Sequence, residues 1–246
     1  MTEPIAITHN VFWVPSTGYS SNVYLVKGDD EFAIIDVGLP RNYQIVVESI
    51  NRLDLIGKKG LIILTHMHYD HIGATKKVSS AYNLPVAIHK NEKIYLENGD
   101  SFYTVALLFG ENEIEPIDVD YELLNGDTFN LGKSVLEIIH TPGHTFGSIV
   151  IYDKKNKILF SGDTVFSSGS FGRTDLPTGN IYELVDSLKK LSRLDVEILC
   201  PGHGDVVYKN ASNQIKLALK RFQNIKAAGE DLKKRRLKFL VKKLSL

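Results

Sequence analysis

The sequence predicts an α/β fold in which two packed β-sheets carry helices on their outer faces. Runs rich in β-branched and apolar residues alternate with segments whose apolar residues follow helical spacing. The second half of the chain repeats the order of elements in the first half, although no sequence repeat is evident. Strands and helices that alternate in two similar halves favour a sandwich with the layer order αββα.

The first half begins with two strands. Residues 22–26 and 31–38 are β-rich runs joined by the turn-forming residues KGDD, which predicts a hairpin. Apolar residues at helical spacing predict an amphipathic helix over 43–53. Residues 60–65 form a short apolar run, typical of a strand buried on both faces, and a second helix is expected over 72–82.

The second half follows the same plan. An alternating strand ends at residue 141, and a hairpin is expected over 148–163, followed by a helix over 181–191 and a strand over 196–200. Between the halves, the stretch 91–115 mixes helical apolar spacing with the turn-forming NGDS. We interpret this stretch as a helical insertion that packs on the core; the alternative is a lid or pocket wall.

Composition places the chain among soluble globular proteins, with 246 residues, 43% hydrophobic and 24% charged. The longest apolar run, LIIL, is far shorter than the roughly 20 residues that cross a bilayer. The N-terminus lacks the basic and apolar regions of a signal peptide. Cys200 is the single cysteine and has no internal disulfide partner. These features predict a cytoplasmic protein without membrane contact.

The segment THMHYDH, residues 65–71, places three histidines and an aspartate directly after a predicted strand. In an extended segment alternate side chains point the same way, so His66 and His68 can converge on one point. Asp70 and His71 follow where the chain turns into the next helix, and they can face a second point nearby. Clustered imidazoles and carboxylates of this kind indicate a metal site.

Three further residues of the same types follow apolar strands later in the chain. Each lies beside a glycine that allows a tight turn: His144 after Gly143, Asp163 after Gly162 and His203 after Gly202. Seven nitrogen and oxygen ligands without sulfur suit two divalent metal ions, with zinc as the first expectation and iron or manganese as alternatives.

We assign the seven ligands to two ions. One ion is expected to bind His66, His68 and His144, and the other to bind Asp70, His71 and His203, with Asp163 as the bridge. Ions bridged in this way lie about 3.5–4 Å apart and activate a shared water. We therefore predict that Asp70 and Asp163 are catalytic.

Other candidate side chains receive different roles. Asp36, at the end of IIDVG, is expected to fix a ligand loop rather than to bind metal itself. His9, His89 and His140 lie outside the glycine-flanked strand ends, and we interpret them as ordinary structural or surface histidines.

The motifs HxHxDH (66–71), TPGHTFGS, FSGDTVF and PGHG, in this order, resemble the metallo-β-lactamase superfamily from about Asn22 to His203. The resemblance implies the αββα sandwich with a dinuclear site at one edge. Within the superfamily, SGDTVFSSGSFGRTDLPTG is similar to the branch of hydroxyacylglutathione hydrolase (glyoxalase II), its small prokaryotic relatives and the persulfide dioxygenases. Only about forty residues separate Asp163 from His203, which disfavours the nuclease branches with their extra domain. Secreted β-lactamases carry signal peptides and usually lack the bridging aspartate.

The ligand set and the resemblance together predict a metal-dependent hydrolase of small-molecule thioesters or esters, glutathione thioesters first. Two metal ions would generate hydroxide from water and polarise the carbonyl group. A thioester suits such a site because its thiolate leaves with little protonation, and no general acid is evident. The alternatives are a mononuclear iron persulfide dioxygenase, a lactonase, and a binding module that has lost catalysis. Arg173 is expected either to clamp a substrate carboxylate or to pair with Asp175.

Positive charge is concentrated at the C-terminus. Residues 215–243 hold eleven Lys or Arg against two acids, in a chain without net charge. We divide the chain into a catalytic domain over 1–210 and a basic helical extension over 211–246. The extension carries an apolar stripe that is expected to dock on the domain or on a second subunit of a homodimer, or else to recruit an anionic substrate (Leu237, Leu240, Val241, Leu244). Nucleic-acid binding through KKRR is the least favoured role.

Overall fold

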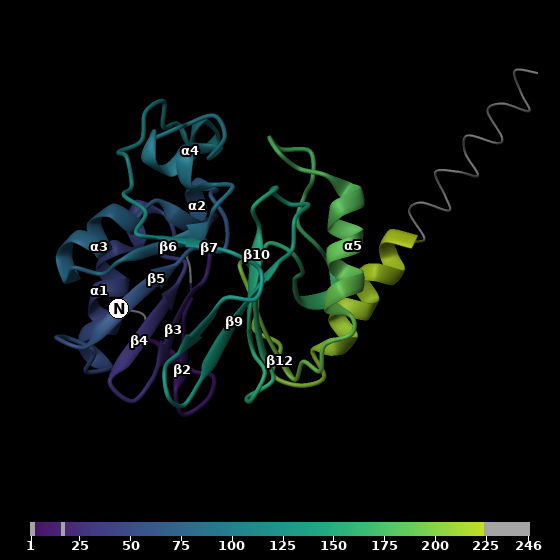
Figure 1. The fold of residues 1–246 in the computed structure, drawn as a ribbon, viewed down its shortest axis with the longest axis horizontal. Coiled ribbons are helices and arrows are strands. Elements are labelled where there is room, and N and C mark those ends of the chain that lie inside the picture. Colours follow the sequence, from purple (N-terminus) through teal and green to yellow (C-terminus); the bar gives the residue numbers. More distant parts are fainter. Residues whose placement is uncertain (1–2, 16–17, 224–246) are drawn as a thin grey trace, which may run out of the picture.

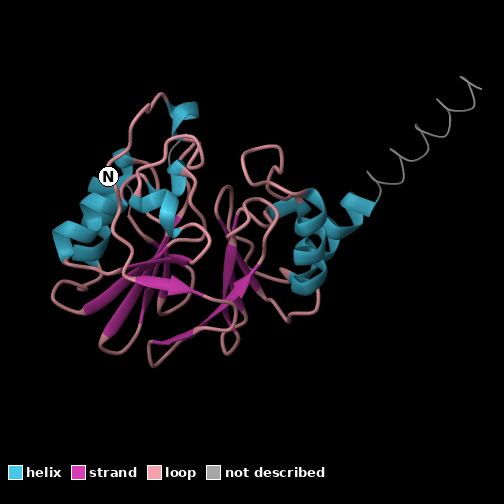
Figure 2. Ribbon diagram, turned by 45° about the horizontal axis from the view of Figure 1, so that its top comes forward, coloured by secondary structure: helices cyan, strands magenta, loops and turns pink. Residues whose placement is uncertain are grey.

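The chain folds into two β-sheets that pack face to face, with helices on both outer sides (Figure 1). The structure is a computed structural model and describes residues 3–15 and 18–223. Figure 2 shows the same layers from a second direction, with strands in the middle and helices outside. This arrangement is the predicted αββα sandwich.

The first sheet has seven strands in sequential order. The first four strands pair antiparallel, and the pairs from β4 to β7 are parallel. The strands are β1 (Ile5–Ala6), β2 (Val11–Val14), β3 (Val23–Lys27), β4 (Glu31–Ile35), β5 (Lys59–Ile63), β6 (Val86–His89) and β7 (Tyr121–Leu123). The parallel pairing makes the carboxyl ends of β4, β5 and β6 meet at one edge of this sheet.

The second sheet has five strands in the order β12-β11-β10-β9-β8, and only the β11–β12 pair is parallel. The strands are β8 (Thr128–Asn130), β9 (Val135–His140), β10 (Ile149–Asp153), β11 (Ile158–Gly162) and β12 (Ile198–Pro201). The parallel pair brings the residues that follow β11 and β12 to the same edge. This edge lies beside the edge of the first sheet where β4, β5 and β6 end.

Helices cover both outer faces. The α-helices are α1 (Tyr43–Arg52), α2 (Tyr69–Ile72), α3 (Thr75–Tyr82), α4 (Lys93–Glu97) and α5 (Ile181–Leu191), and 3-10 turns are η1 (Pro40–Asn42), η2 (Ala106–Phe109) and η3 (Ser167–Gly169). The side chain of Asn180 caps α5 by accepting from the backbone N–H groups of Tyr182 and Glu183. Among the described residues, no helix is long and apolar enough to cross a membrane.

The interior consists of three apolar layers. The middle layer lies between the sheets and contains residues of both, such as Ile63 and Phe160. A second layer lies between the first sheet and α1 and α3, where Val46 and Val78 are fully buried. The third layer lies under α5. Because both faces of β5 contact apolar layers, its continuous apolar sequence is explained.

The prediction of a helix over 72–82 is wrong in its first residue. A separate one-turn helix, α2, covers Tyr69–Ile72, and α3 begins only at Thr75. The helices are separate because the N–H of Ala74 donates to the carbonyl oxygen of Gly38, 2.9 Å away, rather than to the preceding turn. This break leaves α2 to carry Asp70 and His71 on its own.

Part of the C-terminal extension packs on the main body of the protein. Residues 212–223 are helical, and Figure 1 shows this helix in yellow beside α5. Ala211, Ile215 and Ala218 are fully buried in the same apolar layer as Leu184 and Leu188 of α5. The predicted apolar stripe from Leu237 to Leu244 and the basic run KKRR lie outside the described residues.

Candidate metal centre

The seven predicted ligands lie together at the carboxyl edge of the two sheets. His66 and His68 follow β5, and Asp70 and His71 lie on α2. The second sheet contributes three side chains from loops that follow its strands: His144 after β9, Asp163 after β11 and His203 after β12. Both sheets therefore build one site.

His66, His68 and His144 form the first group of potential ligand atoms. The ligand atoms of these buried residues lie within 4.8 Å of one another. The imidazole rings meet nearly edge to face, with an angle of 86° between the rings of His68 and His144. Nε2 of His144 lies 2.9 Å from Nδ1 of His68. The nitrogens therefore point at a common centre rather than at separate partners.

Asp70, His71 and His203 form the second group, and their ligand atoms also lie within 4.8 Å of one another. Nε2 of His203 lies 3.1 Å from Oδ2 of Asp70. The two imidazoles face each other with 3.2 Å between their Nε2 atoms. His71 is fully buried, whereas His203 is partly exposed, so this group is the more open of the two.

Asp163 lies between the two groups. Its Oδ1 is 3.3 Å from Nε2 of His71 and 3.7 Å from Nε2 of His203. Its other oxygen, Oδ2, is 3.5 Å from Nε2 of His144. One carboxylate thus presents one oxygen to each group, which is the geometry of a bridging ligand.

The polar atoms at the centre of the site fit a bound cation. Nε2 of His66 and Oδ1 of Asp163 are buried and have no hydrogen-bond partner within the described part of the chain. Buried polar atoms without partners are rare and costly in native proteins. Divalent ions would satisfy these nitrogen and carboxylate donors, and the ligand roles of the seven residues remain predictions on this basis.

Electrostatics favour the protonation states that metal binding needs at His66, His68 and Asp163, whereas the nearby carboxylates of Asp163 and Asp36 outweigh burial and raise the pKa of His71. Burial, assisted by the neighbouring imidazoles of His71 and His144, lowers the pKa of His66 and His68 well below its usual value. Burial raises the pKa of Asp163, but the facing imidazoles of His203 and His71 outweigh it and hold the pKa well below its usual value. Neutral imidazoles and an ionised carboxylate are the forms that bind metal.

Contacts outside the cluster fix the ligand side chains. Asp36 is buried and accepts from the backbone N–H and the hydroxyl of Thr65, each at 2.8 Å. The same hydroxyl lies 3.1 Å from Nδ1 of His66. On the other side of the site, Nδ1 of His144 donates to the carbonyl oxygen of Arg173 over 2.7 Å. Such contacts set the ring orientation and tautomer of a ligand histidine.

Glu92 is a buried carboxyl group that the sequence did not suggest as a site residue. It is fully buried, and its Oε1 accepts from the backbone N–H of Gly147 over 3.1 Å. This contact ties the start of α4 to the loop that carries His144. Burial raises the pKa of Glu92 to about 7, although hydrogen bonds from Thr145 and Gly147 oppose the rise. An acid three residues after an apolar strand, as in VAIHKNE, was the available signal.

A cavity of about 590 Å³ opens above the cluster. Its floor contains five of the ligand side chains, and its walls are largely apolar (Tyr19, Val105, Leu108, Phe109 and Leu176). The segment 91–115 was predicted to be a core-packing insertion. It packs on the core through Leu96 and Ala106, but it also forms the wall of this cavity, as in the alternative interpretation. Periodicity alone did not distinguish the two roles.

Arg173 also lines the cavity. Its guanidinium pairs with the carboxylate of Asp175 through two hydrogen bonds of 2.8 and 2.7 Å, and both side chains are exposed. The pair that we considered at the sequence level is therefore present. A role for Arg173 in substrate binding stays a prediction.

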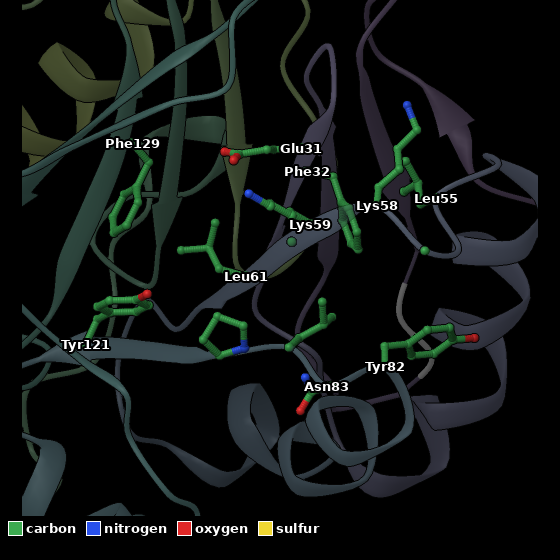
Figure 3. A pocket seen from close by; sticks show the side chains of 14 residues that line it. Glu31, Phe32, Leu55, Lys58, Lys59, Leu61, Tyr82, Asn83, Tyr121 and Phe129 are labelled. Carbon is green, nitrogen blue, oxygen red and sulfur yellow. The ribbon is translucent and has the colours of Figure 1, made fainter.

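The three other histidines lie outside these groups. His89 and His140 stack on each other with 4.1 Å between ring centroids and 10° between ring planes. His9 is exposed. A separate cavity of about 500 Å³ lies at the opposite, amino-terminal ends of β4 and β5 (Figure 3). Its lining includes Lys58, Lys59 and Tyr121 but no histidine, so this cavity offers no imidazole to a metal ion.

An αββα sandwich whose strand ends carry HxHxDH and three further His/Asp side chains in one cluster defines one class of protein. The family model of the Metallo-beta-lactamase superfamily matches residues 16–203, and the chain belongs to this superfamily.

Known relatives agree with this membership. The chain is 39% identical over 212 residues to "Probable metallo-hydrolase MJ0888" of Methanocaldococcus jannaschii, and the match covers 81% of this chain and 95% of the relative. It is 30% identical to human "Acyl-coenzyme A thioesterase MBLAC2", with 85% of each chain covered. It is 33% identical to "Hydroxyacylglutathione hydrolase GloC" of Haemophilus influenzae, with 79% of this chain and 91% of that protein covered.

Solved structures show the same architecture. The crystal structure of BLEG-1 B3 metallo-beta-lactamase has a TM-score of 0.70 and 32% identity, and covers 80% of this chain and 92% of that one. The structure of TTHA1623 in a di-iron-bound form has a TM-score of 0.67 and 30% identity, and covers 85% of this chain and 96% of that one.

Proposed function

We propose that this protein hydrolyses acyl thioesters, with esters as secondary substrates, at a site that holds two divalent metal ions. The observation that carries the proposal is the position of Asp163, whose two carboxylate oxygens face the two groups of ligands. Thioesterase and hydroxyacylglutathione hydrolase relatives support the substrate class. Zinc is the first expectation for the ions, and the di-iron form of a structural relative makes iron the second.

Two ions bound between these ligands would supply Lewis acidity and would make water a nucleophile near neutral pH. The chain's own residues contribute position and charge. His66, His68 and His144 are locked by burial and by contacts to Thr65 and Arg173. The apolar cavity walls exclude water around a bound acyl group. A thiolate leaves with little protonation, so the cavity needs no acid beside the leaving group.

The experiment compares purified, metal-replete protein on S-lactoylglutathione, an acyl-coenzyme A and an oxygen ester, with metal content measured by elemental analysis. We expect two ions per chain, turnover of the thioesters, and loss of turnover after chelation that added metal restores. Asp163→Asn should lose turnover by at least about a thousandfold, since charge stabilisation at such sites has effects of that order. His9→Ala is the matched control, because His9 is an exposed histidine outside the cluster.

The same preparations test the other reactions proposed for this fold. Oxygen consumption with glutathione persulfide and one iron per chain would identify a persulfide dioxygenase instead. Turnover restricted to lactones or to a β-lactam would assign the site to those substrates. Metal-replete protein that is inactive on all thioesters would contradict the proposal.

A further inference from the structure

The cavity above the metal ligands has two chemically different parts. Its floor is polar and includes His68, Asp163 and His203. Its apolar wall, defined here as Tyr19, Val105, Leu108, Phe109 and Leu176, comes from three separate segments of the chain. A volume of about 590 Å³ is in the range of sites that enclose a small molecule.

Two residues of the apolar wall are exposed to an unusual degree. Leu108 is 66% exposed and Tyr19 is 81% exposed, although apolar side chains of this size normally avoid water. Exposed apolar side chains at the mouth of a cavity indicate a binding site for an apolar group.

Val105 occupies its place in the wall at a conformational cost. Its backbone lies in the left-handed region, with φ 52° and ψ 21°, where a β-branched residue is a genuine outlier. Its side chain is only 5% exposed and lines the cavity. Strained residues of this kind cluster at functional sites, where the surrounding structure holds them in place.

The wall is anchored to the helix that carries two of the predicted ligands. The backbone N–H of Tyr69, the first residue of α2, donates to the carbonyl oxygen of Thr104 over 2.8 Å. The rings of Tyr69 and Phe109 contact each other, with 6.0 Å between their centroids. The wall thus has a fixed position relative to Asp70 and His71, the next two residues of α2.

We infer that the apolar wall binds the acyl chain of the substrate, so that the protein prefers thioesters with apolar acyl groups of several carbons over the small hydroxyacyl group of S-lactoylglutathione. This inference rests on the proposed thioester hydrolysis and names its substrate class. A polar hydroxyacyl group would leave the exposed side chains of Leu108 and Tyr19 in contact with water, whereas an alkyl chain would bury them.

The test is a series of thioesters with one common thiol and acyl chains of two, four, six and eight carbons. We expect kcat/KM to rise about fourfold per methylene until the cavity is filled, the ratio that about 0.8 kcal/mol per buried CH₂ gives. In a second series, with a constant acetyl group and lengthening alkyl thiols, kcat/KM should depend much less on alkyl length. A flat acyl series, or a dependence on the thiol side alone, would overturn the inference.

Two neighbouring leucines provide a matched pair of variants. Leu108→Ser should reduce the preference for octanoyl over acetyl several-fold, because Leu108 lines the cavity. Leu107→Ser should leave it unchanged, since Leu107 is exposed outside the cavity lining. Val105→Gly removes the side chain and the backbone strain together, so we expect a weaker chain-length preference without a fall in Tm. A lower Tm with an unchanged preference would make Val105 a purely structural residue.

Binding of S-alkyl thioethers separates this inference from the proposed reaction. These compounds cannot be hydrolysed, and their Kd for the full-length protein should fall with alkyl length in the wild type and less so in Leu108→Ser. Chain-dependent thioether binding without hydrolysis of any thioester would uphold the apolar site and reject the proposed reaction. Hydrolysis of all thioesters at equal rates would do the reverse.

Discussion

The Nδ1 atom of His71 donates a hydrogen bond of 2.8 Å to Oδ2 of Asp36, and both side chains are buried. This contact places the proton on Nδ1 and leaves Nε2 free to face Asp163 and His203. Asp36 holds this position with a backbone φ of 54°, a conformation that only a few per cent of non-glycine residues adopt. The contact thus connects a strained strand end of the first sheet to the predicted ligands.

Replacing Asp36 with Asn should weaken metal binding. An amide oxygen can accept from either Thr65 or His71, but it lacks the negative charge that orients the Nδ1 proton of His71. Loss of such contacts typically lowers metal affinity by about 10–100-fold. Competition with a chromogenic chelator measures this affinity. Equal affinities in the wild type and the variant would show that Asp36 is not needed to orient His71.

Gly202 tests how closely the backbone approaches the cluster. A methyl group at this position would run into Oδ1 of Asp163 and lie 2.8 Å from Cε1 of His71. Gly202→Ala should therefore displace ligands and lower the metal content below two ions per chain, as read by elemental analysis. Gly126→Ala is the control for backbone strain without a clash, because φ is 95° there but a methyl group would meet no atom within 4 Å. Full metal content in Gly202→Ala would contradict the observed packing.

Glu92 should make stability depend on pH. Its pKa is raised to about 7 in the folded state, against 4.5 for the free group, so the folded state binds more protons between these values. The contribution of Glu92 to the free energy of unfolding is therefore largest below about pH 4.5 and falls by roughly 3 kcal/mol as the pH rises to about 7. Denaturant unfolding at constant metal concentration, from pH 5 to 8, measures this fall.

Glu92→Gln isolates this contribution, because its side-chain amide stays neutral over this pH range. The free energy of unfolding of this variant should lack most of the fall. Glu113→Gln, at an exposed position, should retain it. A fall of the same size in wild type and Glu92→Gln would assign the pH dependence to other groups.

Arg173 contributes differently through its backbone and its side chain. Because its carbonyl oxygen accepts from His144 and its guanidinium lies in an exposed pair with Asp175, Arg173→Ala keeps the contact to His144. The free energy of unfolding should change by less than about 1 kcal/mol, as for most surface ion pairs. KM should rise about tenfold for thioesters whose thiol carries a carboxylate, and stay constant for an uncharged thiol. A constant KM for both would limit Arg173 to its structural pair.

The strand-end motifs made much of this architecture predictable. The strands before residues 66, 163 and 203 and the helices over 43–52 and 181–191 follow local periodicity, so local sequence was sufficient to place them. The two groups of predicted ligands could also be predicted, because the loops after those strands meet at one edge of the sheets. The short strands β1, β2, β6 and β7 were not predicted, since strands of two to four residues carry little periodic signal.

The parts that escaped prediction depend on tertiary contacts. Glu92 approaches Gly147 across 55 positions of sequence, and nothing in either segment alone indicates the contact. Val105 gains its position from a backbone conformation that its residue type disfavours. Tyr19 and Leu176 meet over the cluster only because the two sheets are closed on each other. Residue types predict the chemistry of this site better than its shape.

Each group of predicted ligands draws on both sheets: His144 completes the first group and His203 the second. Metal ions would therefore add bonds between two halves of the polypeptide that are otherwise joined at this edge by apolar packing and by hydrogen bonds such as those from Ile149 to Thr65 and from Gly147 to Glu92. Ligands that bind only the native state lower the population of open states. In a cell starved of the metal, we expect faster proteolysis of the newly made protein, so that metal supply sets the abundance of the enzyme as well as its activity.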